Sequence, residues 1–203
     1  MDIGKNSKFL TGCGSVLVAV LTLVACKHDS EMPTVYDDSR IYKLPYESGK
    51  DRFLIQGYDG PFSHSGYELD FVMPVGSLVL ASRGGVVSGV VDVWSESCPL
   101  QKDCANNYIS IDHLDGTWGE YLHIKKGGAC VEIGQTIAQG DGIALSGNVG
   151  ISLLPHVHFS VAGNVVEPPV FADIDSRGSG IPVPAVYYLS ANLLATNHCD
   201  NED

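Results

Sequence analysis

Two histidines one residue apart, His156 and His158, are the residues of this chain best suited to chemistry. In an extended strand, side chains two residues apart point to the same face and lie about 7 Å apart. One imidazole of such a pair can bind a metal ion while the other transfers protons. His64, Asp70 and His123 precede the pair, and two neutral imidazoles with one carboxylate fill three positions of a tetrahedral zinc site. The fourth position stays open for water, so the pattern predicts a hydrolase rather than a binding module.

Short β-rich segments separated by glycine must position these side chains. The sequence predicts strands at residues 53–56, 77–81, 85–94, 108–113, 119–124, 135–138, 143–146 and 156–162. No long segment has helical periodicity, and the valines of residues 86–93 indicate a strand buried on both faces. The expected fold is therefore all-β, an antiparallel β-sheet sandwich or barrel-like domain with turns at the glycines.

Chain length bounds the domain organisation. The 203 residues have room for one domain with appendages, and we expect the folded domain at residues 52–171. Residues 26–51 are polar and carry two prolines, which is typical of a tether, with an extra edge strand as the alternative. Residues 172–203 form a C-terminal extension, whose apolar stretch at 185–195 is expected to pack on or near the domain as a short helix or strand.

The first 25 residues have the features of an export signal. Lys5 and Lys8 supply positive charge, and the apolar run of residues 16–24 is too short for a membrane span. The residues that end at Cys26 resemble a bacterial lipobox, in which the signal is cut before the cysteine and that cysteine is lipidated. We therefore expect an exported lipoprotein. Lys27 after the lipidated position implies sorting to the outer membrane, and we expect the protein on its periplasmic side. A plain signal peptide or an uncleaved anchor is the alternative.

Apart from the expected lipidation site Cys26, four cysteines remain once the expected signal is removed: Cys98, Cys104, Cys130 and Cys199. An even number of cysteines in an exported protein favours disulfides. Of the three pairings that four cysteines allow, we favour Cys98 with Cys104 because a short loop closes easily, which leaves Cys130 for Cys199. A cysteine zinc site is the other interpretation, but the sequence has no C-x-x-C spacing to support it.

The charge of the chain excludes one class of partner. Its formal net charge is −12 at pH 7. Nucleic-acid binding requires a basic face that contacts phosphates, so we expect no nucleic-acid partner.

Several short motifs follow one another between residues 53 and 165. They are Phe62–Gly66, Leu69–Phe71, Pro74–Ala81, Gly85–Val87, His113–Thr117, Tyr121–His123, Gly134–Ile137, Ser146–Gly150 and Pro155–Phe159. In this order they resemble the motifs of the lysostaphin-type zinc metallopeptidases, a family of bacterial cell-wall endopeptidases. An ordered series is far more specific than any single motif.

The resemblance implies a role for each of five residues. His64, Asp70 and His158 would bind one zinc ion per chain, and His123 and His156 would be the catalytic pair. The pair would deprotonate a zinc-activated water, stabilise the tetrahedral oxyanion and deliver a proton to the leaving amine. The division of labour between the two histidines is left open.

The spacing of the first two ligands departs from the usual family pattern. The usual ligand spacing in the family is H-x-x-x-D, whereas five residues separate His64 from Asp70, so that Glu68 occupies the usual position and is a rival ligand. We prefer Asp70 because the residues from 70 to 74 continue the family motif and carry the carboxylate into a strand. Tyr58 sits where some relatives place a tyrosine that donates to the oxyanion; the alternative is a simple strand aromatic.

The remaining histidines have simpler interpretations. His113 precedes a turn and is expected to be a satisfied core or surface group, with at most a supporting or cleft role in the resemblance. His28 lies in the expected tether and His198 in the tail, so both are expected to be solvated.

Three functions are compatible with these features of the sequence. The first is a membrane-tethered zinc metalloendopeptidase that cuts peptide cross-links or stem peptides of peptidoglycan. The second is a non-catalytic family member that activates a cell-wall amidase and so has an envelope protein as partner. The third is a disulfide-stabilised surface lipoprotein that serves as an adhesin or scaffold and binds no metal. The presence of every ligand and catalytic histidine favours the enzyme.

Overall fold

The structure is a computed structural model, and it describes residues 40–58, 63–165, 167–174 and 179–200. All of these residues belong to one compact unit, Tyr36–Asp203. The expected signal sequence, Cys26 and His28 lie outside the described residues. Within the described ranges, no helix has the length and apolar character that a membrane span needs.

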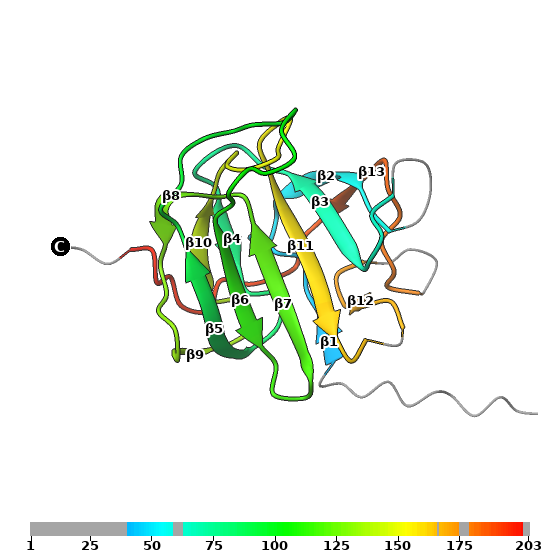
Figure 1. The fold of residues 1–203 in the computed structure, drawn as a ribbon. Helices are drawn as coiled ribbons and strands as arrows, with labels where there is room; N and C mark the ends of the chain where they lie inside the picture. The colour runs from blue at the N-terminus through cyan, green and yellow to red at the C-terminus, as the bar shows by residue number, and fades with distance from the viewer. Residues whose placement is uncertain (1–39, 59–62, 166, 175–178, 201–203) are drawn as a thin grey trace, which may run out of the picture. The chain divides into compact units, whose positions relative to one another are not determined.

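The described residues form thirteen strands, shown in Figure 1. Their bounds are β1 Ile41–Tyr42, β2 Asp51–Gln56, β3 Glu68–Val72, β4 Leu78–Leu80, β5 Gly85–Val91, β6 Tyr108–Asp112, β7 Thr117–Leu122, β8 Ile124–Ala129, β9 Thr136–Ile137, β10 Gly142–Ser146, β11 His156–Gly163, β12 Val170–Phe171 and β13 Val186–Leu189.

Eight of the strands form one large sheet in the order β13-β2-β3-β11-β7-β6-β5-β9. Every neighbouring pair in this sheet is antiparallel. The longest strand, β11, lies between β3 and β7 (Figure 1). A second sheet has the order β4-β10-β8, and the short strands β1 and β12 pair in parallel.

The two larger sheets share one hydrophobic core. Phe71, Tyr121 and Phe159 of the large sheet and Val79 and Ile143 of the small sheet are buried in the same cluster. Burial of this apolar surface is the main favourable term in folding. The all-β sandwich predicted from the sequence is confirmed.

Alternation along β11 explains how the core supports the site. Val157 and Phe159 are fully buried in the core, and because successive side chains of a strand point to opposite faces, His156 and His158 face the other way. The apolar residues fix the register of β11, and a shift of one residue would exchange the two faces.

The predicted tether extends too far into the chain. Ile41–Tyr42 forms β1, which pairs with β12, and β2 already begins at Asp51. Tyr42, Leu44 and Tyr46 alternate into the core and are almost completely buried. Residues 41–51 therefore belong to the folded domain, because removing this much apolar surface from water stabilises their docking.

The C-terminal extension packs on the domain as a strand rather than as a helix. Its strand β13 pairs with β2 at one end of the large sheet. A disulfide between Cys130 and Cys199 ties the end of the extension to the residue that follows β8.

The strand predicted at residues 85–94 also differs from the structure. β5 ends at Val91, and among its residues only Val87 is buried. The expectation of burial on both faces is wrong, because only one face of β5 meets the core. The run of valines instead leaves apolar side chains partly exposed.

Candidate active site

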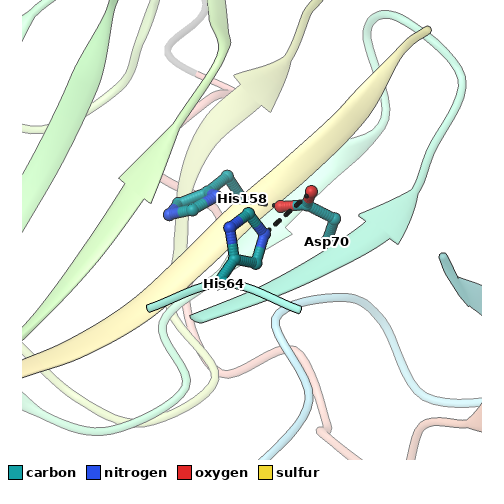
Figure 2. Close-up of side chains that lie close together, drawn as sticks. All are labelled: His64, Asp70 and His158. Carbon is teal, nitrogen blue, oxygen red and sulfur yellow. Dashed lines mark hydrogen bonds and ion pairs between the residues drawn. The ribbon is translucent and has the colours of Figure 1, made fainter. Parts of the chain in front are cut away.

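His64, Asp70 and His158 meet on the face of the large sheet opposite the core (Figure 2). The register places Asp70 of β3 directly opposite His158 of β11, and such cross-strand neighbours have Cβ atoms about 5 Å apart. His158 Nδ1 donates to Asp70 Oδ1 at 2.9 Å. His64, in the loop before β3, donates from Nε2 to Asp70 Oδ2 at 3.1 Å.

The donor set of this group fits a zinc ion. One ligand atom from each of the three residues lies within 4.8 Å of the others. Two imidazole nitrogens and one carboxylate oxygen are the ligands that catalytic zinc takes from a protein when one position is left for water. Asp70 is almost fully buried, so the chain has already removed its carboxylate from water.

Contacts within the group shift the pKa values of Asp70 and His64 in opposite directions. Burial alone would raise the pKa of Asp70, but hydrogen bonds from His158 and His64 outweigh it and hold that pKa well below its usual range. Burial would lower the pKa of His64, yet the hydrogen bond and charge of Asp70, with the charge of Glu68, raise it. Asp70 is thus an anion at neutral pH, ready to bind a cation.

His123 and His156 form a second pair of imidazoles, with ring centroids 4.4 Å apart. His123 Nδ1 lies 2.6 Å from the Val149 carbonyl oxygen, and His156 Nδ1 lies 2.8 Å from that of Leu154. A carbonyl oxygen only accepts, so each Nδ1 carries the proton and each Nε2 is left with a lone pair. His156 Nε2 lies 3.6 Å from Asp70 Oδ1, which places the pair beside the ligand group.

An unusual backbone conformation brings His123 to this pair. Tyr121 is buried in the core and Leu122 lines the cleft, so continued alternation would direct residue 123 toward the core. His123 instead has a φ of 63° and lines the cleft. This left-handed conformation costs a residue with a Cβ atom about 1–2 kcal/mol, and such strain is typical of functional sites.

The ligand group and the histidine pair, five residues in all, line one cleft with a volume of about 360 Å³. Its other walls are mainly apolar and come from three segments. They are Ile55 and Gln56 at the end of β2, Pro99 in the Cys98–Cys104 loop, and Ile151 to Leu154 before β11, and Leu122 at the end of β7 adds to them. A mostly apolar cleft with a few convergent polar groups is typical of a binding or active site.

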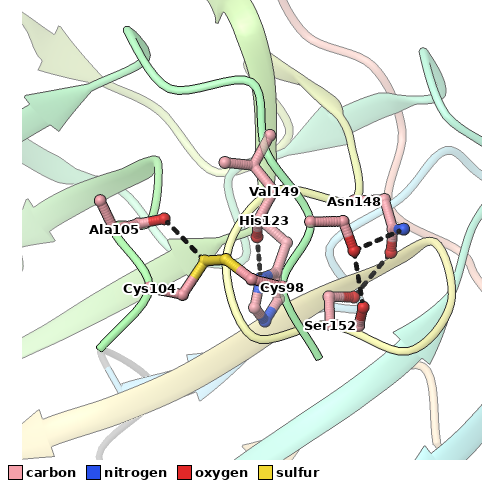
Figure 3. Close-up of a disulfide and its surroundings, with 8 residues drawn as sticks. Cys98, Cys104, Ala105, His123, Asn148, Val149 and Ser152 are labelled. Atoms are coloured by element: carbon pink, nitrogen blue, oxygen red, sulfur yellow. Dashed lines mark hydrogen bonds between the residues drawn. A yellow bond between two sulfur atoms is a disulfide. The ribbon is translucent and has the colours of Figure 1, made fainter. Parts of the chain in front are cut away.

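The Cys98–Cys104 disulfide lies next to this cleft (Figure 3). Cys98 N donates to the Gly150 carbonyl at 2.9 Å, and Asn106 Oδ1 accepts from His123 N at 3.3 Å. Both predicted disulfides are present in the structure. The hydrogen bond from Cys98 to Gly150 attaches the Cys98–Cys104 loop to the segment that carries the Val149 carbonyl.

Ser152 links that segment to the second histidine. Its hydroxyl lies 2.7 Å from Asn148 Oδ1 and 3.1 Å from His156 Nδ1, and its carbonyl accepts from Ser97 Oγ at 2.9 Å. Sequence reasoning missed Ser152 and Asn106 as supporting residues. Ser152 lies between two recognised motifs, which is a weak signal, and Asn106 lies in none.

Tyr58 is the predicted site residue that the structure does not bring to the cleft. Its ring packs edge to face against Tyr67 at 5.3 Å and contacts the core, and it is absent from the described cleft lining. This position agrees with the alternative of a packing aromatic, and the oxyanion role of Tyr58 stays a prediction.

The two remaining histidines that the structure describes lie away from the cleft. His113 is buried, donates from Nδ1 to the Gly84 carbonyl at 2.8 Å, and packs against Tyr42. His198 is less solvated than expected, because it contacts Asp141 and Gln135 beside the tail disulfide.

This geometry agrees with the family to which the sequence belongs. Residues 63–168, just over half of the chain, match the sequence profile of peptidase family M23. The chain is therefore a member of peptidase family M23.

Curated relatives share this region at moderate identity. The peptidoglycan DD-endopeptidase ShyA of Vibrio cholerae is 37% identical over 92 residues, which are 45% of this chain and 19% of the relative. An uncharacterized metalloprotease of Buchnera aphidicola is 37% identical over 93 residues, which are 46% of this chain and 22% of the relative. The chain thus spans about a fifth of the length of the curated relatives that it matches.

Solved structures with a similar chain trace include two peptidases. The catalytic domain of lysostaphin from Staphylococcus simulans is 24% identical, with a TM-score of 0.42, over 59% of this chain and 84% of that chain. A zinc-containing peptidase from Vibrio cholerae is 28% identical, with a TM-score of 0.46, over 61% of this chain and 37% of that chain.

Proposed function

We propose that this protein is a zinc metalloendopeptidase that hydrolyses peptide bonds in the cross-links or stem peptides of peptidoglycan. The observation that carries the proposal is the meeting of the His64–Asp70–His158 group and the His123–His156 pair in one cleft. Two relatives named as peptidoglycan DD-endopeptidases, with 37% and 34% identity, support peptidoglycan as the substrate.

His64, Asp70 and His158 are the residues that would hold the zinc ion. When bound, zinc lowers the pKa of a water molecule toward neutrality and polarises a substrate carbonyl. Asp70 supplies the negative charge for this site, and its contacts to both histidines orient their rings before the metal arrives.

His123 and His156 would carry the protons. Burial, followed by the neighbouring His156, lowers the pKa of His123 to about 4, so His123 is neutral at physiological pH and can accept a proton. Each histidine donates from Nδ1 to a backbone carbonyl and turns its basic Nε2 away from that carbonyl. Together the two side chains would take a proton from the attacking water, stabilise the oxyanion and protonate the leaving amine.

The proposal extends to the location of the protein. The sequence of residues 1–27 supports export as a lipoprotein anchored through Cys26, with residues 26–40 as the remaining tether. This would place the cleft on the periplasmic side of the outer membrane, beside its substrate. Incorporation of labelled palmitate that is lost in Cys26→Ser would support it, and labelling that persists in Cys26→Ser would contradict it.

The test of the activity is digestion of purified peptidoglycan, with the released muropeptides identified by mass spectrometry. We expect wild-type protein to release peptides cut at one type of bond, and His123→Ala to reduce the rate by about 10²- to 10⁴-fold. Because His123 is not a proposed ligand, this variant should keep its zinc. A wild-type protein that binds zinc but leaves peptidoglycan intact would refute the proposed substrate.

A further inference from the structure

Glu68 is a second carboxylate beside the metal-binding group, and the proposed ligand set leaves it without a role. Its Oε2 atom lies 3.2 Å from His64 Nδ1 and 3.8 Å from His158 Nε2. Asp70 contacts the opposite nitrogens, His64 Nε2 and His158 Nδ1. The two carboxylates therefore face opposite edges of the same two imidazoles.

The strand and the loop before it place Glu68 at this position. Glu68 is the first residue of β3, and its side chain points to the same face as Asp70 because the two residues are two positions apart. The loop returns over the strand, with His64 N bonded to the Gly57 carbonyl and Glu68 N to that of Gly66. A Cβ atom on Gly66 would lie 3.1 Å from Glu68 Oε1, so the glycine leaves room for the carboxylate.

The contact between Glu68 and His64 determines which nitrogen of His64 can bind metal. The negative charge of the Glu68 carboxylate, 3.2 Å from His64 Nδ1, favours a proton on that nitrogen. The nitrogen left for a metal ion is Nε2, which already points at Asp70. The 3.8 Å separation from His158 is too long for a hydrogen bond, so Glu68 acts on His158 only through its charge.

We propose that Glu68 is a positioning residue that holds His64 as a zinc ligand, by forming an ion pair with its Nδ1 edge and fixing the orientation of the ring. This inference rests on the proposed function, since it requires that zinc binds at His64. A carboxylate behind a ligand histidine increases the basicity of the ring, and loss of such a partner costs about 10- to 100-fold in metal affinity.

The experiment measures the zinc affinity of the full-length protein by competition with a chromophoric chelator. We expect Glu68→Ala to weaken zinc binding by about 10- to 100-fold. Glu68→Gln should retain part of the affinity, because its amide oxygen can still face His64 Nδ1 but lacks the charge. The visible absorption spectrum of the cobalt-substituted protein should be the same in wild type and in both variants, because no ligand is lost.

Glu120→Ala is the matched control. Glu120 faces the same side of the sheet two strands away, opposite Ser160, which is itself opposite Glu68. Its carboxylate accepts from Ser160 Oγ, so this variant removes a similar charge and should leave zinc affinity unchanged within about twofold.

Three results would overturn the inference, and they differ in what they say about the proposed function. Equal zinc affinity in wild type and Glu68→Ala would remove the role of Glu68 and leave the proposed function intact. A cobalt spectrum with altered coordination in Glu68→Ala would make Glu68 a ligand instead. A wild-type protein that binds no zinc would refute both proposals.

Discussion

His64 is the ligand whose protonation competes most directly with metal. Each of its ring nitrogens faces a carboxylate, Asp70 on one side and Glu68 on the other. Burial opposes protonation, but these two partners raise the pKa of His64 above its ordinary value of 6.5. At pH values below this raised pKa, a metal ion must displace a proton from His64 in order to bind.

This arrangement predicts that zinc binding releases a proton and weakens as the pH falls. A ligand histidine must be neutral, so affinity should drop by about tenfold per pH unit for each proton displaced, once the pH is below the raised pKa of His64. Calorimetric titration in buffers of different ionisation enthalpy measures the proton release. An affinity that stays constant from about pH 7.5 to pH 5.5 would contradict the assignment of His64 as a ligand.

The five proposed functional residues at the cleft could be chosen from the sequence, because each lies in a recognisable motif. What the sequence could not show is the backbone at His123, since its φ of 63° reverses the alternation that the strand pattern implies. The role of Asn106 was not predictable either. An asparagine whose side-chain oxygen accepts from the backbone of a histidine has no distinctive sequence spacing from that histidine.

At the level of elements, the Cys98–Cys104 loop is attached to the segment that holds His123. The loop bonds to Gly150, and Val149 accepts from His123 Nδ1. We predict that Cys98→Ser with Cys104→Ser lowers kcat by up to about 100-fold, because misplacing a catalytic group by about 1 Å has effects of this size. Zinc affinity should stay within about twofold, since the loop supplies none of the proposed ligands.

Removal of the Cys130–Cys199 disulfide is the control, because it should affect stability more and kcat less than removal of Cys98–Cys104. This bond closes a loop of sequence separation 69, against 6 for the first one. By loop entropy its loss should lower the free energy of unfolding by about 4 kcal/mol, against about 2 kcal/mol for the shorter loop. Loss of the Cys130–Cys199 disulfide should change kcat little, because this bond holds the C-terminal tail and not the cleft. Urea unfolding and steady-state rates on both double variants separate the two effects, and equal kcat losses would contradict the account.

The longer strands were predictable from apolar alternation and bounding glycines, whereas the short elements were not. Strand β11 follows its predicted range closely because Val157, Phe159 and Val161 alternate into the core. Strands β1 and β12 have two residues each, which is too short for a periodic signal. Strand β8 has the sequence IKKGGA, whose glycines read as a turn, so only its pairing with β10 makes it a strand.

For the whole molecule, His113 links pH to stability from outside the cleft. It is buried against Tyr42, and within the described residues its Nε2 has no hydrogen-bond partner. Burial lowers the pKa of His113 below its ordinary value of 6.5, so the unfolded chain binds a proton more readily than the folded protein. The stability that this histidine contributes is therefore complete above pH 6.5 and is lost as the pH falls from there through its folded pKa.

We predict that the free energy of unfolding of wild type declines between about pH 7.5 and pH 5.5, and that His113→Asn reduces this decline. Asparagine keeps a donor near the position of Nδ1 but does not titrate. Urea titrations of both proteins at the two pH values measure the difference, which removes the contribution of the other histidines. A decline of the same size in His113→Asn would show that His113 does not carry the effect.

The boundary of the folded domain was the least predictable feature at this scale. Residues 41–46 carry charged and proline residues typical of a linker, yet alternate positions fill the core with Tyr42, Leu44 and Tyr46. A segment of this kind is held by contacts distant in sequence, such as the bond from Tyr46 Oη to the Tyr188 carbonyl. Local composition does not contain that information.

The zinc content of the purified protein tests the central claim most directly. Elemental analysis should find about one zinc ion per chain in wild type and almost none in His158→Ala, because removal of one of three ligands abolishes tight binding. Chelation should remove the metal together with peptidoglycan digestion, and added zinc should restore both. A wild-type protein prepared in the presence of zinc that holds none, or a His158→Ala variant that keeps a full complement, would contradict the account.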